Sequence, residues 1–581
     1  MSNKYLDEES RQEQEKENIR NELQNRYQPD WNECEEVFTP MNTIKEYLGE
    51  TDADIEWNIN AKAAYDTFLN IAAYETFKEN DSIILVGRTG TGKSSILNRY
   101  KYAVEHGEIL GFNLVVEIKF QRFFDKLKLY DFEENSNAVH YIKDVLRIII
   151  QLAVMQKVVK SFDSNTDGLD CLKETLELVC IFDDTNIIER FCDDLDEKFD
   201  PSDKLRKAML LIKKSYDNIV KDHSVESLNR VLDGRRVVVL ADSLDYYDIT
   251  EKRIIILNRA LIELAFEYFQ QLKDKRFLLK VAVPSEVYKH ILEGIVAKKK
   301  AKTVTIEWRY KDLIKMLAIK TFYCFKVKNY SFAKEFIEEY NLEDFYDFDI
   351  AYKFLSNMLP QNCHASIPMC FDTISYCIRH TQKKPRQIIK IFNSFIERIC
   401  EEKQFSFFIY NDKLIPKYIH RVQYDIIDDA LSMYNAYAKQ EVLPIVSNAL
   451  RKKRNFMSLK DLNDAAKDAA KIYSVLGLSP DDIKNILIES GLVGVVYKEH
   501  FIKENSELFQ NKVVNKISIA VFEYQRKDKL THRSGFVYIL HPMCYEYYVN
   551  EIDYNALVYP APANDLGDNI INKLMEQNII Y

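Results

Sequence analysis

Gly87-Arg88-Thr89-Gly90-Thr91-Gly92-Lys93-Ser94 decides the fold, and it directly follows the apolar run Ser82-Ile83-Ile84-Leu85-Val86. The stretch has the spacing GxxxxGK[ST]. A loop with this spacing must turn sharply and point several backbone N–H groups inward, which glycine permits because it has no side chain. The apolar run predicts a buried strand before the loop. The run Ser95-Ile96-Leu97-Asn98-Arg99-Tyr100 predicts an amphipathic helix after it.

A strand, a glycine-rich loop and a helix in this order are typical of a P-loop, which holds the phosphates of a nucleotide. We expect Lys93 to reach the β- and γ-phosphates and the Ser94 hydroxyl to bind Mg²⁺, with the positive end of the helix aimed at the phosphates. The predicted ATP-binding residues are Gly87, Arg88, Thr89, Gly90, Thr91, Gly92, Lys93, Ser94 and Ser95. The alternative is a glycine-rich turn that binds no ligand.

The composition is that of an ordinary globular protein. Apolar side chains make up 47% of the 581 residues and charged side chains 29%, unlike a disordered chain. A chain of this length holds about three or four domains of roughly 150 residues each. Only 14 glycines and 13 prolines occur, so we expect a mostly helical body around a small parallel sheet.

Charge, cysteine pattern and hydropathy restrict the partners and the compartment. The net charge of −10 argues against a protein that coats nucleic acid, because such binding needs clustered Lys and Arg. The ten cysteines form no CxxC pair, and the amino terminus does not resemble a signal peptide, which predicts a cytoplasmic protein. No window of about 18 apolar residues occurs, so we expect no membrane association.

Hydrophobic patterns divide the chain into four predicted parts. They are a polar helical or flexible N-terminal segment, an α/β core with a helical insertion, a further helical region and a C-terminal domain: 1–40, 41–310 (insertion at about 137–230), 311–404 and 405–581. Within the core, runs rich in β-branched residues predict further buried strands, at 113–120, 237–241 and 277–283.

The strand at 237–241 ends at Asp242-Ser243-Leu244-Asp245. A carboxylate at the end of a buried strand is costly unless it has a partner. The Mg²⁺ ion of a bound nucleotide is such a partner, and the segment is similar to a Walker B motif, in which Asp242 would order the metal. The alternative is an aspartate that only caps the next helix.

The order of these motifs resembles that of AAA+ and STAND-like (origin-initiator-like) P-loop ATPases with an added central strand, over about residues 40–400. In that family the segment 277–286 corresponds to the sensor-1 strand. The segment 303–314 leads to the helical lid, and 380–389 is similar to a sensor-2 helix. The resemblance implies that Arg386 reads the γ-phosphate.

Two departures from the family pattern concern hydrolysis. The family usually has Glu after the Walker B aspartate as general base, and this chain has Ser243 there. We expect Asp245 to position the attacking water instead, and hydrolysis to be slow if it does not reach that water. Sensor 1 lacks its usual residue, for which Ser285 or Glu286 would substitute. Arg253 and Arg259 are the candidates for an arginine finger, with surface salt bridges as the alternative.

The C-terminal domain resembles a winged helix. Helices are predicted over about 423–451, 458–475 and 480–491, followed by strands at 516–524 and 535–540 that a charged loop joins into a hairpin. The basic residues of that loop would suit phosphate contacts: Arg526, Lys527, Lys529, His532 and Arg533. The third helix is acidic, so packing against the ATPase is the favoured role and nucleic-acid binding the alternative.

The expected fold class is an α/β P-loop NTPase core with a large helical insertion, a helical lid and a C-terminal winged-helix-like domain. The sequence predicts a Mg²⁺-dependent ATPase that acts as a molecular switch within an assembly, either a homo-oligomer or a complex with an effector protein. Family resemblance alone associates such chains with bacterial stress or anti-phage defence. The alternatives are an ATP-gated DNA-binding loader or regulator and a nucleotide-bound scaffold without turnover.

Overall fold

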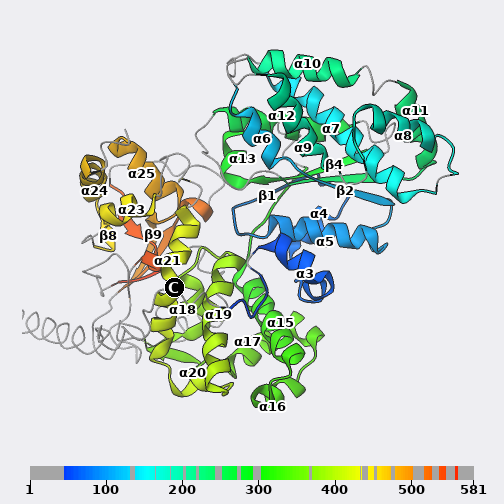
Figure 1. Cartoon of the computed structure of the whole chain (residues 1–581). Coiled ribbons are helices and arrows are strands. Elements are labelled where there is room, and N and C mark those ends of the chain that lie inside the picture. The colour runs from blue at the N-terminus through cyan, green and yellow to red at the C-terminus, as the bar shows by residue number, and fades with distance from the viewer. Residues whose placement is uncertain are drawn as a thin grey trace, which may run out of the picture. The chain divides into compact units, whose positions relative to one another are not determined.

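The computed structural model forms two compact units, drawn in Figure 1. The first, here called the sheet unit, contains Ala53–Tyr65 and Asn70–Glu307, and the second, the C-terminal unit, contains Trp308–Tyr581 with Asp66–Leu69 and the residues before Ala53. The structure describes residues 45–50, 52–130, 138–163, 165–182, 185–199, 204–217, 222–242, 252–270, 277–291, 302–364, 370–431, 434, 442–450, 454–472, 478–501, 516–525, 535–544 and 556–560.

A five-stranded, all-parallel sheet forms the centre of the sheet unit. Its strands are β1 (Ile84–Gly87), β2 (Leu114–Lys119), β3 (Val237–Asp242), β4 (Phe277–Pro284) and β5 (Thr303–Thr305). The spatial order is β2-β3-β4-β1-β5, so β4 lies between β1 and β3. The apolar runs that predicted the first four strands are buried, because a parallel sheet is covered on both faces.

Helices cover both faces of this sheet, with α4 and α5 on one side and α7 and α12 on the other (Figure 1). The helices outside the insertion are α3 (Ala53–Asp66), α4 (Ala72–Phe77), α5 (Lys93–Glu105), α6 (Gln121–Leu127), α12 (Lys252–Gln270) and α13 (Ser285–Ile291). The predicted insertion is helical, with α7 (Ala138–Ser161), α8 (Leu169–Leu178), α9 (Ile187–Lys198), α10 (Leu205–Asp217) and α11 (Asp222–Leu232). A parallel sheet flanked by helices is therefore confirmed.

The C-terminal unit begins with a helical region whose core is rich in phenylalanine. Its helices are α15 (Tyr310–Lys328), α16 (Lys334–Glu338), α17 (Phe348–Ser356), α18 (Thr373–Arg379), α19 (Pro385–Glu402), α20 (Phe407–Tyr410) and α21 (Leu414–Leu431), and a short hairpin joins β6 (Asn362–His364) to β7 (Cys370–Asp372). Phe322, Phe345 and Phe354 pack with ring centroids 4.9–6.2 Å apart. Prolines mark two helix starts, since Pro385 begins α19 and Pro416 lies in the first turn of α21.

The remaining residues of this unit combine helices with a mixed sheet. The elements are α23 (Leu443–Leu450), β8 (Phe456–Met457), α24 (Leu459–Ile472), α25 (Pro480–Glu489), β9 (Val493–Phe501), β10 (Lys516–Val521), β11 (Tyr538–Leu540) and β12 (Ala556–Pro560), with strand order β12-β10-β9-β11-β8. The predicted hairpin of β10 with β11 is wrong, because both strands pair with β9 between them.

A second correction concerns the helix predicted over 423–451. The structure has α21 and α23 there, and α21 already begins at Leu414. Pro444 explains the start of α23, because proline fits the first turn of a helix but not its interior. No helix in the described ranges is long and apolar enough to cross a membrane.

Candidate functional site

The glycine-rich loop connects β1 to α5 at the carboxyl edge of the parallel sheet, and its glycines are required by its shape. A Cβ at Gly87 would lie 2.6 Å from Oγ1 of Thr91 and 2.9 Å from Cδ1 of Ile306. Gly90 and Gly92 have φ angles of 79° and 92°, in the left-handed region that other residues avoid. The predicted loop therefore has the tight path that its spacing indicated.

Contacts inside the loop converge on one carbonyl group. Thr91 donates to the Arg88 carbonyl oxygen through its backbone N–H at 3.2 Å and through its hydroxyl at 2.6 Å. The Lys93 ammonium donates to the same oxygen at 3.4 Å, and only 3% of this lysine is exposed. The loop thus holds a buried cation at the start of α5, where the backbone N–H groups of the first helical turn also carry positive partial charge.

The two residues predicted to hold Mg²⁺ meet in the structure. The Ser94 hydroxyl in the first turn of α5 donates to Oδ2 of Asp242 at the end of β3, at 2.6 Å. These residues are 148 positions apart in sequence, so the fold alone brings them together. A hydroxyl and a carboxylate are the hard oxygen ligands that Mg²⁺ prefers, and the donor set therefore fits this ion.

Four neighbouring residues were missed by sequence reasoning. Lys119 ends β2 and is the register partner of Asp242. Its ammonium lies 2.5 Å from Oδ2 of Asp54 on α3, whose Oδ1 accepts from the Asn98 amide at 3.1 Å. Trp57, also on α3, donates to the Ser95 hydroxyl at 3.5 Å. The sequence did contain a signal for Lys119, because this residue ends a predicted strand and the carboxyl ends of parallel strands lie at the same edge of a sheet.

Electrostatics favours a charged Lys119. Partial burial lowers the pKa of this lysine, but the hydrogen bond to Asp54 and the negative charges of Asp54, Glu117 and Asp242 outweigh burial and leave the pKa raised. Glu117 lies 3.8 Å from the ammonium group, farther than Asp54. A cation therefore accompanies the carboxylate at the end of β3.

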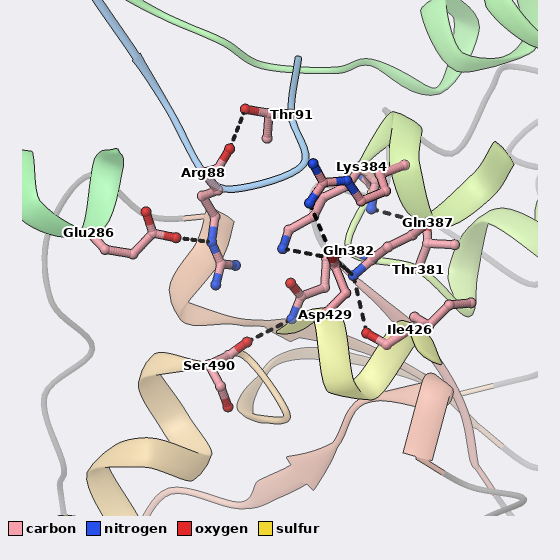
Figure 2. Close-up of polar contacts among 12 residues, drawn as sticks. Arg88, Thr91, Glu286, Thr381, Gln382, Lys384, Gln387, Ile426, Asp429 and Ser490 are labelled. Carbon is pink, nitrogen blue, oxygen red and sulfur yellow. Dashed lines mark hydrogen bonds and ion pairs between the residues drawn. The ribbon is translucent and has the colours of Figure 1, made fainter. Parts of the chain in front are cut away.

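The Arg88 side chain contacts Glu286, one of the two residues predicted to substitute at sensor 1 (Figure 2). Its Nε donates to Oε1 of Glu286 in the first turn of α13 at 2.9 Å, and both side chains are about one-tenth exposed. The Ser285 hydroxyl donates to the other oxygen of that carboxylate at 3.1 Å. Glu286 therefore binds the loop arginine, and Arg88 braces the loop against the end of β4.

Arg386, in the C-terminal unit, takes part in an ionic cluster around the buried carboxylate of Asp429. Figure 2 shows Asp429 with two other members of this cluster, Lys384 and Gln387. Its guanidinium lies 3.3 Å from Oδ1 of Asp429 on α21, and Lys384 lies 3.6 Å from Oδ2. The Gln387 amide also donates to Oδ2, at 3.1 Å. Burial alone would raise the pKa of Asp429, but Lys384, Arg386 and Lys390 lower it overall. The predicted sensor-2 residue is thus held by a carboxylate that is only 7% exposed.

The same cluster continues toward the mixed sheet. Oε1 of Gln387 accepts from the backbone N–H of Gln382 at 2.7 Å, and the Gln382 amide donates to the carbonyl of Ser490 at the end of α25, also at 2.7 Å. Gly491 follows with a φ of 76°, and a Cβ there would lie 2.6 Å from the Tyr524 ring and 3.0 Å from the Gln382 amide. One chain of polar contacts therefore joins α19, α21 and α25.

The acidic character of α25 has a local explanation. The Ser479 hydroxyl accepts from the backbone N–H of Asp482, and the Asp482 carboxylate accepts from the backbone N–H of Ser479. This pair of hydrogen bonds is a capping box. The single lysine of this helix, Lys484, pairs with Asp481 at 2.6 Å and with Asn463 at 3.4 Å. These contacts leave α25 poorly suited to read DNA. The basic loop at 526–534 lies outside the described residues.

The remaining site predictions divide into two groups. Ser243 and Asp245 lie outside the described residues, as does the segment 1–44. Both candidate arginine fingers make contacts within the sheet unit, Arg253 with the Lys128 carbonyl and Arg259 with Glu263 at 2.9 Å.

Comparison with known proteins gives no assignment. No protein-family model matches the chain, and no significant match to a curated protein was found. The resemblance to AAA+ and STAND-like ATPases remains a prediction from motifs. The geometry around Lys93, Ser94 and Asp242 is therefore the basis for inferring function.

Proposed function

We propose that this protein is an AAA+/STAND-like molecular switch that binds ATP with Mg²⁺ and hydrolyses it slowly. The observation that carries the proposal is the 2.6 Å contact between Ser94 and Asp242 beside the glycine-rich loop. Open α/β sheets bind their ligands at the carboxyl ends of their strands, where this contact lies. The position of β4 between β1 and β3 also supports the proposal, because the resemblance implied an added central strand.

Each residue of the site has a distinct proposed role. The loop N–H groups bind the β- and γ-phosphates, and Lys93 contributes its positive charge from a buried position. Ser94 and Asp242 hold Mg²⁺, which when bound neutralises charge on the phosphate oxygens. Asp245 remains the candidate for orienting the attacking water, and Arg386 the candidate for reading the γ-phosphate.

The cluster around Asp429 bears on the proposed conformational switch and not on the hydrolysis of ATP. A buried carboxylate shared by Lys384, Arg386 and Gln387 is sensitive to the loss of any one of them, because the remaining buried charges would be left without compensation. Gln382 extends the cluster to α25. Any change in the contacts of Arg386 would therefore alter the packing of α21 and α25 within the C-terminal unit.

The experiment compares ATP binding and phosphate release by the full-length wild type with those of two variants. Lys93→Ala is expected to weaken Mg²⁺·ATP binding by about 100-fold, which corresponds to one hydrogen bond to a charged group. Lys101→Ala is the matched control. Lys101 lies on the same helix as Lys93, and it pairs with Glu117 rather than with a residue of the loop. It is expected to bind ATP like the wild type.

Three outcomes separate the candidate functions. ATP binding with slow, Lys93-dependent phosphate release supports the switch. Binding without turnover would support the nucleotide-bound scaffold instead. Equal ATP affinity in wild type and Lys93→Ala, or none in either, would refute nucleotide binding at this loop.

A further inference from the structure

A positive charge at the γ-phosphate, in addition to the P-loop lysine and the metal, accelerates phosphoryl transfer. The sequence offered Arg253 and Arg259 for this role. Among the described residues of the sheet unit, however, Arg259 pairs with Glu263 and Arg253 donates to a backbone carbonyl. We propose that Lys119 is a catalytic cation of the site, which contacts the γ-phosphate from the end of β2. The inference rests on the proposed ATPase function.

The register of the sheet places Lys119 beside Asp242, one of the two proposed Mg²⁺ ligands. Lys119 and Asp242 are partners on adjacent parallel strands, so their side chains leave the sheet on the same face about 4.8 Å apart. Asp242 contacts Ser94 on α5, and Lys119 contacts Asp54, which in turn binds Asn98 on α5. Both end residues therefore face the helix that follows the glycine-rich loop.

The contacts of Lys119 allow it to move. Its side chain is 50% exposed and that of Asp54 is 34% exposed, and exposed ion pairs are weak. A phosphate oxygen carries at least as much negative charge as the carboxylate, so Lys119 can exchange one for the other. The nucleotide therefore replaces Asp54 as the partner of Lys119, and Asp54 takes no part in the hydrolysis step.

The chemical step is ordinary hydrolysis. Oxygen of water forms a bond to the γ-phosphorus, while the bond from that phosphorus to the β–γ bridging oxygen breaks and its electron pair remains on ADP. One proton of the water stays on the released phosphate and the other passes to solvent. Lys119 stabilises the charge on the transferred phosphoryl oxygens and neither gains nor loses a proton.

The experiment uses the full-length chain with Mg²⁺·ATP and measures ATP Kd, single-turnover phosphate release and retention of ADP with aluminium fluoride. Lys119→Met is expected to lower the turnover rate about 100-fold, as removal of one donor to the transferred phosphoryl oxygens does, with Kd changed by less than about threefold. Lys119→Arg should restore at least about one-tenth of the rate because it keeps the charge. Lys126→Met on α6 is the control, because Lys126 pairs with Asp196 rather than with a neighbour of Lys119, and it should behave as wild type.

Asp54→Asn distinguishes catalysis from anchoring of α3. If Lys119 acts on the phosphate, this variant keeps turnover within about threefold of wild type. Equal loss in Asp54→Asn and Lys119→Met, or unchanged turnover in Lys119→Met, would overturn the inference. If the wild type binds ATP without turnover, the retention of ADP with aluminium fluoride becomes the deciding measurement. Loss of this complex in Lys119→Met supports the catalytic role of Lys119, and retention equal to that of the wild type overturns it. Failure of the proposed function is distinct, since it shows as ATP binding that does not depend on Lys93.

Discussion

Lys280 lies in the middle of β4, and its charge makes the stability of the sheet unit depend on pH. The residue is fully buried, and its ammonium donates to the carbonyl oxygens of Phe77, Glu79 and Ser82 at 2.5, 2.8 and 2.7 Å. It therefore ties the end of α4 and the chain entering β1 to the central strand. Burial lowers its pKa to about 7 from the ordinary 10.5, and the charges of Asp81 and Glu79 oppose that shift only partly.

The sign of the pH dependence follows from proton binding. Between pH 7 and 10.5 the unfolded state binds more protons at this lysine than the folded state, so stability rises with pH. With these two pKa values, the contribution changes by about 2 kcal/mol between pH 7 and 9. Lys280→Met abolishes this contribution and leaves three carbonyl groups without their donor. The wild type should therefore have a higher free energy of unfolding than the variant. This difference should be about 2 kcal/mol larger at pH 9 than at pH 7.

The assay is urea unfolding at both pH values, followed by the fluorescence of Trp57. The chain has three tryptophans, so Trp31→Phe and Trp308→Phe are introduced in every protein to restrict the signal to the sheet unit. Lys78→Met, which removes a half-exposed lysine paired with Glu75, should show no change in its gap to wild type. A gap for Lys280→Met that is equal at the two pH values, or smaller at pH 9, would refute the reasoning.

Three further substitutions test the loop and the C-terminal cluster. Gly87→Ala should weaken ATP binding by about tenfold, or ~1.4 kcal/mol, because its Cβ meets a threonine oxygen at 2.6 Å; unchanged Kd would contradict this. Asp429→Asn should destabilise the C-terminal unit by about 3 kcal/mol in urea, because it leaves a buried lysine uncompensated, whereas exposed Asp425→Asn should not. Gln382→Leu should speed amide hydrogen exchange in α25 about fivefold through loss of its bond to Ser490, and unchanged exchange would count against the coupling.

Local patterns predicted the parts of the site that lie next to each other in sequence. The apolar run before Gly87 and the glycine spacing determine the strand, the loop and the start of α5. The meeting of Ser94 with Asp242 was also predictable, because both occur in motifs whose chemistry requires a shared ion. Lys119 and Asp54 were missed because neither belongs to a motif. Their importance depends on strand register and on where α3 packs.

The error in the C-terminal domain has the same origin. Sequential strands often pair, which favoured a hairpin of β10 with β11. Strand β9 lies between β10 and β11 and prevents that pairing. The sequence did not reveal β9, because its start, Val493-Gly494-Val495-Val496, is a short apolar run that a single sequence does not distinguish from the end of α25. Gly494 permits the close approach, since a Cβ there would lie 2.6 Å from the carbonyl oxygen of Val521. Contacts of this kind are set by tertiary packing rather than by periodicity.

Slow turnover and the Asp429 cluster are mutually consistent in the proposed switch. A switch needs a nucleotide-bound state that outlasts the rearrangement it triggers. In the proposed switch, Ser243 stands where the ATPases that the chain resembles have a glutamate general base, and this difference would lengthen that state. Arg386, Lys384 and Gln387 share one buried carboxylate, so the loss of one of these contacts would leave buried charge uncompensated. Slow turnover would limit a rapid motor, whereas it suits a protein that signals by whether its nucleotide is bound.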